Sequence, residues 1–198
     1  MFIVLRKIGF GIVGLLFLVA GSAQAQSHGG RSSLGTGSFV YSKSGVLVDF
    51  GLFYGQSEAA GNPSTQNFKE NVSIYDIKLG YITDSNWYFG GLYSVRNDSD
   101  TLGTTNGKAG GLGAGYFFHN NFNFRAYYRF QETYGDYTDG SGFQLDLEYK
   151  VAFSSNFYIG ALISHHQTQF TSNNTIAGFS SYTQKDTYPA VTLGFLID

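Results

Sequence analysis

Two carboxylates are the most obvious candidates for chemistry in this chain. Asp146 and Glu148 stand two residues apart, so on a strand both project from one face, as the paired carboxylates of a glycoside hydrolase could. Lys150 continues the same face, and Arg125 and Arg129 share one face of another alternating segment. With these cations nearby and no sign of a substrate cleft, the pattern favours structural ion pairs over acid and base catalysis.

The histidines and glycines give no stronger signal. His165 and His166 are adjacent, so on a strand they point to opposite faces and cannot bind one metal ion together. The glycines at 110, 111, 113 and 115 lack the spacing of a nucleotide-binding loop, and no helix is expected after them. We therefore predict no catalytic residue, no metal site and no cofactor, and we expect that the protein is not an enzyme.

The segment from Phe122 to Gln131 shows what kind of element must position these side chains. Aromatic residues and Ala126 occupy one face, while Arg125, Arg129 and Gln131 lie on the other. Alternation with a period of two indicates a strand between two unlike surroundings. An aromatic face opposite an arginine-bearing face fits a wall with lipid outside and a polar filling inside.

A unit of turn and strand recurs along the chain. Trp87, Phe122 and Phe157 are spaced 35 residues apart, and each follows an asparagine in a short polar turn, in the segments TDSNW, FHNNF and FSSNF. Repeated turns followed by alternating strands of about 9–11 residues are typical of a transmembrane β-barrel. A soluble β-sandwich is the alternative.

The amino-terminal segment has the order of a secretory signal peptide. Arg6 and Lys7 precede an apolar run over residues 8–20, and Ala23 and Ala25 flank a glutamine before the expected cleavage site. We predict a signal peptide over residues 1–25, a flexible periplasmic tail over residues 26–43 and a barrel over residues 44–198.

Composition narrows the class of protein further. The chain has no cysteine, so it uses neither disulfides nor thiolate metal sites. It contains 12 basic and 14 acidic residues and no basic patch, which speaks against nucleic acid as a partner. High glycine and aromatic content with two prolines favours an all-β chain.

We predict eight strands, over residues 46–54, 72–82, 87–96, 108–118, 122–130, 142–151, 157–166 and 182–197. Links after the second, fourth and sixth are short, and we expect longer outer loops over residues 56–71, 97–107, 135–141 and 171–181. An even strand number lets the sheet close, so that no edge remains in hydrocarbon. The predicted fold is an all-β, eight-stranded, antiparallel, up-and-down transmembrane β-barrel.

The alternation also sorts the charged and aromatic side chains. We expect an ion-pair network that fills the interior, because charges removed from water must be paired; its members are Asp49, Asp76, Lys78, Arg96, Arg125, Arg129, Asp146, Glu148 and Lys150. Aromatic residues near the two strand ends predict two girdles at the membrane interfaces. One girdle is Tyr81, Trp87, Phe118, Phe122 and Phe157, and the other is Tyr54, Tyr93, Phe130, Phe143 and Phe170.

With its leader, strand pattern and unequal loops, the chain resembles the small eight-stranded outer-membrane barrels of Gram-negative bacteria, of the outer-membrane protein A, X and W type, over residues 46–198. The resemblance implies location in the outer membrane, contact with its lipid and lipopolysaccharide, and insertion by the barrel assembly machinery. Barrels of this type commonly end on an aromatic residue, whereas this chain ends GFLID.

A structural or surface-interaction role with a closed interior is the function that we expect. A small porin for small solutes is the first alternative, and extracellular ligands or divalent cations at the outer loops are a further one. Some outer-membrane barrels are lipid A deacylases, in which a histidine and a serine lie two apart on one strand face beside an acid. Here Ser164 lies two residues before His166, and no acid follows until Asp186, so this resemblance is weak.

Overall fold

The computed structural model describes residues 7–8, 44–60, 67–101, 103–118, 121–152, 154 and 156–197. The predicted tail over residues 26–43 lies outside the described residues, as does the predicted signal peptide apart from Lys7 and Ile8. The described part consists of strands and turns, and it holds no helix long and apolar enough to cross a membrane.

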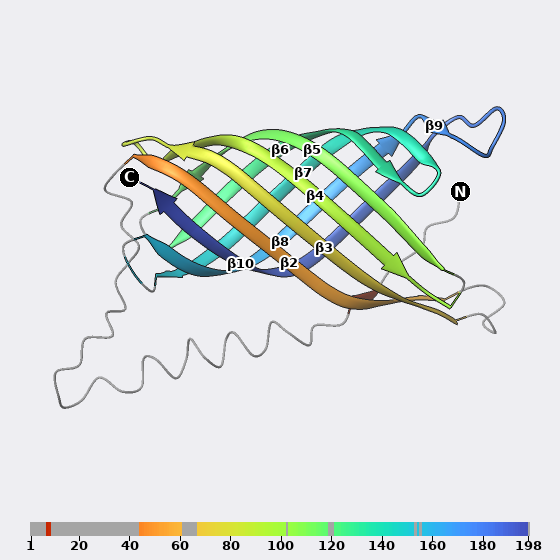
Figure 1. Ribbon diagram of the computed structural model, residues 1–198, viewed down its shortest axis with the longest axis horizontal. Coiled ribbons are helices and arrows are strands. Elements are labelled where there is room, and N and C mark those ends of the chain that lie inside the picture. Colours follow the sequence, from red (N-terminus) through yellow and green to blue (C-terminus); the bar gives the residue numbers. More distant parts are fainter. Residues whose placement is uncertain are drawn as a thin grey trace.

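Eight long antiparallel strands form a closed barrel (Figure 1). They are β2 (Gly45–Ala60), β3 (Asn67–Ile82), β4 (Trp87–Ser99), β5 (Thr104–Phe117), β6 (Phe122–Tyr134), β7 (Tyr137–Ala152), β8 (Phe157–Phe170) and β10 (Tyr182–Ile197). The two-residue strands β1 (Lys7–Ile8) and β9 (Ser172–Asn173) pair with β2 and β7. Consecutive long strands are neighbours, and pairing of β10 with β2 closes the ring, so the predicted all-β, eight-stranded antiparallel barrel is confirmed.

Strand tilt follows from the register of the ladders. Paired residues followed from Leu52 through β3, β4 and β5 reach Thr133 on β6. Followed the other way through β10, β8 and β7, they reach Phe122 on the same strand. The two end points are 133 − 122 = 11 positions apart, a stagger that requires the strands to run obliquely, as Figure 1 shows.

The alternation of side chains assigns the two faces of the wall. On β7, Leu145 and Leu147 are exposed on the outside, whereas Asp146 and Glu148 are fully buried inside. The same rule gives an outer surface rich in apolar side chains and an interior rich in charged ones. Apolar side chains therefore dominate the outer face, and charged side chains fill much of the interior.

The strands are longer than the sequence pattern predicts, which corrects three of the four expected loops. Ladder pairing continues over much of residues 56–71, 97–107 and 135–141, leaving links of 61–66, 100–103 and 135–136. Only residues 171–181 remain mainly a loop, in which β9 lies. Segments rich in Gly, Ser and Asn have the composition of loops, which is why loops were predicted. In the structure, antiparallel pairing continues through these segments, so the strands extend beyond the apolar part of the wall.

Several inward glycines make room for tyrosine rings. Gly194 on β10 is paired with the fully buried Tyr158 on β8, and a Cβ added at Gly194 would overlap the Tyr158 ring. Gly80 and Gly90 accommodate Tyr88 in the same way. The bulky inward side chains therefore depend on small residues in the neighbouring strands.

Gly194→Ala should destabilise the barrel by about 1–3 kcal/mol, because overpacking forces the buried ring of Tyr158 to move. The matched control is Gly91→Ala, since a Cβ at Gly91 meets nothing closer than the Gly111 carbonyl oxygen at 3.6 Å. Urea unfolding of the two variants in lipid vesicles measures the difference. Equal unfolding midpoints would contradict this packing argument.

Candidate functional site

The interior of the barrel is filled by side chains in layers, and the end near the short turns is apolar. The apolar side chains at this end form one layer, to which strands from all around the ring contribute, and each of these side chains is at most 5% exposed. The hydroxyl of Tyr127 donates to the hydroxyl of Tyr88 at 3.3 Å, so these buried polar atoms are partly satisfied within the layer. The members are Leu47, Ile82, Tyr88, Leu92, Phe117, Tyr127, Tyr158 and Leu196.

Arg125 is the centre of the ionic layer above. Its guanidinium lies 2.6 Å from a carboxylate oxygen of Asp49 and 2.8 Å from one of Glu148, and all three side chains are fully buried. β6, β2 and β7 supply the three residues, so this cation joins opposite parts of the wall. Charge-assisted hydrogen bonds of this length are the strong kind and hold such an arrangement rigid.

Two lysines extend the ionic layer. Lys78 lies 2.6 Å from Asp146 and 3.8 Å from Asp76. Lys150 lies 3.5 Å from Glu148, and its ammonium also lies 3.7 Å from the centre of the Tyr158 ring. The second contact is a cation–π interaction that joins the ionic layer to the apolar layer below it.

A second ionic group occupies the half of the interior near the outer loops. Arg129 bonds Glu132 at 2.9 Å, and Arg96 bonds Asp98 at 2.7 Å and Asp186 at 2.5 Å. His166 Nε2 lies 3.1 Å from a carboxylate oxygen of Asp186, without the geometry of a hydrogen bond.

Tyr134 stands at the outer end of β6, beside this group. Its hydroxyl donates to Asp98 at 2.7 Å. Burial and the neighbouring Asp98 carboxylate raise the pKa of Tyr134 above its ordinary value, so the hydroxyl stays protonated and remains a donor.

The structure places all nine side chains of the predicted network in the interior, each at most 7% exposed. It brings seven of them into direct pairs with one another, around Arg125, Lys78 and Lys150. Arg96 and Arg129 instead pair with acids that the sequence argument did not assign to the interior.

Three interior acids were missed, for two reasons. A β-bulge between Arg129 and Glu132 shifts the alternation, so Gln131 is exposed with a φ of 52° and Glu132 points inward. The expected inward position of Gln131 was therefore wrong. Asp98 and Asp186 follow the regular alternation of their strands and point inward. Asp98 lies two residues after Arg96, so continuing the alternation of that strand by two residues would have predicted it beside Arg96.

One predicted girdle residue is corrected by the structure. Phe170 is fully buried and lies inside, where it stacks on Tyr182 and contacts Tyr137. It has the same phase on β8 as the buried His166 and Thr168, so proximity to the strand end was a misleading guide. The other nine aromatic residues are exposed or half-exposed on the outside.

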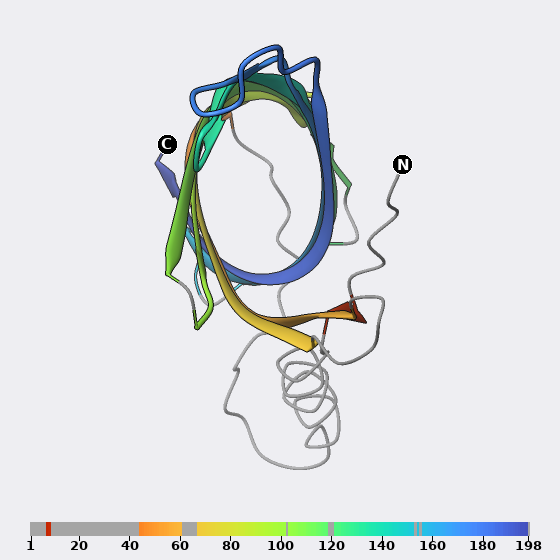
Figure 2. The same cartoon turned by 90° about the vertical axis from the view of Figure 1, so that its right-hand side faces the viewer.

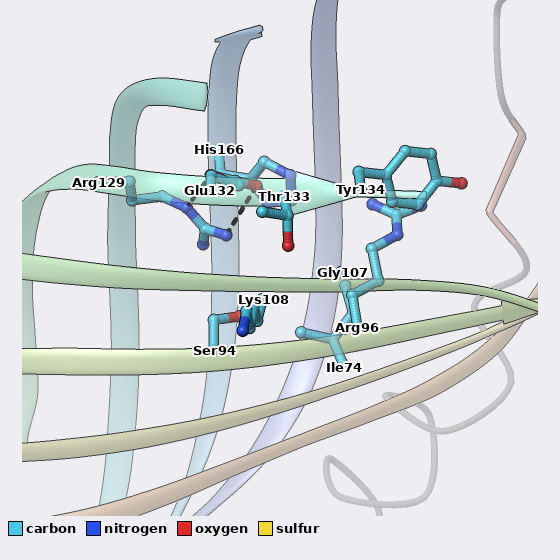
Figure 3. A pocket seen from close by; sticks show the side chains of 10 residues that line it. All are labelled: Ile74, Ser94, Arg96, Gly107, Lys108, Arg129, Glu132, Thr133, Tyr134 and His166. Atoms are coloured by element: carbon cyan, nitrogen blue, oxygen red, sulfur yellow. Dashed lines mark hydrogen bonds and ion pairs between the residues drawn. The ribbon is translucent and has the colours of Figure 1, made fainter. Parts of the chain in front are cut away.

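One cavity in the interior is very small. The cavity beside Arg96, Arg129, Glu132 and His166 measures about 10 Å³, which is about enough for one water molecule (Figure 3). Among the described residues, seven interior carboxylates stand against five lysine and arginine side chains in addition to His166, and no group of three metal-ligating side chains occurs. The arrangement is therefore one of mutually paired charges with a small acidic excess.

The residues of the weak deacylase resemblance do not form a catalytic group. Ser164 is fully buried on the inward face, and its hydroxyl donates to Asp146 at 2.7 Å. His166 also points inward, toward Asp186. Both side chains are thus turned away from the outer surface that a lipid substrate would meet.

A broader hollow lies at the outer end, where the start of β5, the β6–β7 turn and the loop after β8 meet. It measures about 610 Å³ and is lined mostly by polar groups. The Asn173 side chain accepts hydrogen bonds from the backbone amides of Thr175 and Ile176 at 2.9 Å, and Thr175 also bonds Asp136. These hydrogen bonds therefore fix the conformation of the loop after β8 where it lines the hollow.

Comparison with known protein families, with curated proteins and with solved structures gave no match to this chain.

Replacing Arg125 by methionine should cost about 3–5 kcal/mol of unfolding free energy, because Asp49 and Glu148 then stay buried without their cation. Urea unfolding measures the loss, with Lys185→Met on the exposed face of β10 as the control. Adding Asp49→Asn and Glu148→Gln to the first variant should restore part of the stability. An unchanged midpoint for Arg125→Met would contradict a network held together by this residue.

Proposed function

We propose that the protein is an integral outer-membrane barrel with a structural or surface-interaction role and a closed interior. The observation that carries the proposal is the inverted distribution of polarity. Large apolar side chains such as Leu112, Phe89 and Ile163 are 55–65% exposed, while Arg125 and Lys78 are fully buried. Soluble proteins rarely expose contiguous apolar surface on this scale, whereas a barrel in lipid must.

The height of the apolar band supports membrane insertion. On β2 the outward residues are apolar from Val46 to Tyr54, and Gln56 follows. This run covers nine positions, within the length of about 9–11 residues that a tilted strand needs to cross a bilayer. Aromatic side chains near both ends of the band fit the two interfaces.

The rest of the proposal concerns orientation and partners. The short turns and the carboxyl-terminal end of β10 would face the periplasm, and the hollow beside Asp136 and Asn173 would face outward. Lipid and lipopolysaccharide would surround the wall, and the barrel assembly machinery would insert it after removal of the predicted leader. Extracellular ligands would meet the outer ends of the hairpins, where binding residues on a rigid scaffold usually lie.

A small porin is the second candidate, and the acidic excess of the interior is the observation that favours it. If the interior opened, its seven carboxylates would select cations over anions. The apolar layer near the short turns and the paired charges above it argue for the closed form.

Leu147→Arg should prevent stable insertion, since arginine on the lipid-facing side near the bilayer midplane costs about 2–4 kcal/mol. Leu147 is 49% exposed and lies at the middle of the outward apolar run of β7, residues 143–151. Gln169→Arg is the matched control, because Gln169 is an exposed outward residue of β8 whose partners Ser141 and Thr183 lie beyond the apolar band. Heat-modifiable gel mobility after refolding into vesicles reports the folded fraction, and normal folding of Leu147→Arg would argue against a membrane-facing wall.

The folded protein should show no single-channel conductance in a planar bilayer, because the apolar layer blocks water. Replacing both Tyr88 and Tyr158 by alanine removes two of its rings and should allow ion leakage. Discrete, reproducible openings of the unaltered protein would favour the porin instead.

A further inference from the structure

The seam that closes the barrel is paired over only half of its length. β10 and β2 form seven residue pairs, from Ile197 with Val46 to Val191 with Leu52. Both strands then continue, β2 to Ala60 and β10 back to Tyr182, without pairing to each other. On its other edge, β2 pairs with β3 over its whole length, and β10 likewise pairs with β8 over almost its whole length. The split is therefore confined to the seam between β2 and β10. Figure 2 shows the far ends of β2 and β3 bending away from the ring.

The split begins beside Tyr54, the last residue of the apolar band on β2. Outward residues beside the paired part of the seam include Phe50 and Leu193, whereas Gln56, Lys185 and Thr187 lie beside the split. Unpaired backbone groups in hydrocarbon cost several kcal/mol each, so a membrane barrel must be sealed across that band. Beyond it, water or another strand can satisfy the backbone, and the split is permitted.

The split does not provide an entrance to the interior. At its base the ring of Phe53 from β2 lies 5.2 Å from the ring of Tyr188 on β10, and both are buried. Closer to the Tyr182 end of β10, Asp186 forms an ion pair with Arg96. These contacts favour a partner that lies along the edge of β2 over a solute that passes between the strands.

The structure itself shows a strand on this edge. β1 pairs antiparallel with β2, and the register sets Lys7 opposite Glu58 and Ile8 opposite Ser57. Continuing the β10 ladder past Val191 and Leu52 would also set a lysine, Lys185, opposite Glu58, because 191 + 52 = 185 + 58. The paired segment places a basic residue opposite Glu58, and an extended β10 ladder would do the same; opposite charges at such a position stabilise a strand pair.

We propose that the edge of β2 from Phe53 to Ala60 is a strand-addition site for an extended segment of a second polypeptide, with a basic residue opposite Glu58. Main-chain hydrogen bonds would supply the affinity, and the charge pair would help to set the register. Lys7 and Ile8 belong to the predicted leader, whose removal uncovers the edge. This inference rests on the proposed function in one respect: the membrane location decides from which side of the membrane the partner would reach the edge of β2.

A pair of cysteines tests the split directly, because the chain has no cysteine of its own. Gln56→Cys with Thr187→Cys occupies positions that would be partners if the ladder continued. Phe50→Cys with Leu193→Cys is the matched control, since these residues are partners on the same face of the same two strands. Oxidation of protein extracted from membranes should cross-link the control pair only. Equal cross-linking of both pairs would show a closed seam and overturn the proposal.

A synthetic peptide of sequence YTQKDTY, residues 182–188, serves as the added strand. It should slow amide hydrogen exchange over residues 53–60 about tenfold at ten times its Kd. The same peptide methylated on alternate backbone nitrogens should have no effect, and a peptide with Lys185→Glu should bind more weakly.

The other outcomes would overturn the proposal in distinguishable ways. No slowing by the peptide, or equal slowing by its methylated form, would exclude strand addition. Slow exchange with lipopolysaccharide alone would assign the edge to lipid, and mass spectrometry that finds Lys7 and Ile8 retained on a protected edge would assign it to the chain's own leader. Normal folding of Leu147→Arg would instead count against the membrane location and leave these results standing.

Discussion

Pairing of charges removed from water is the constraint on which the rest of this structure depends. Once a wall is apolar outside, its polar residues must turn inward, where a charge without a partner is strongly destabilising. Arg125 meets this requirement by binding Asp49 and Glu148, which come from two other strands. The stagger of the ladders brings these three positions together, so strand register and charge pairing support each other.

Side-chain volume is the second condition for closure. Tyr88, Tyr127 and Tyr158 occupy an interior that has little more width than side chains need, and small residues such as Gly194 in neighbouring strands make room for them. Lys150, over the ring of Tyr158, connects this apolar layer to the charges above it.

The seam between β2 and β10 shows how far closure is required. Backbone pairing between them extends over most of the apolar band and stops at Leu52 and Val191. The next outward residues are Tyr54 and Pro189, and the polar residues Gln56 and Thr187 follow them. A sheet edge is excluded from hydrocarbon but tolerated in water. For a barrel in lipid, as proposed above, the rule that requires closure across the apolar band would therefore permit an open edge beyond it.

Alternation along the sequence was sufficient to predict the eight strands, the faces of residues such as Asp146 and Leu147 and nine of the charged residues inside, because a period of two depends only on local backbone geometry. The bulge that turns Glu132 inward, the pairing that extends the strands through polar segments and the choice of Asp186 as a partner of Arg96 were decided by the tertiary structure. Each depends on how one strand pairs or packs with another. Phe170 illustrates the difference, since its position near a strand end suggested the interface, while its phase on β8 places it inside.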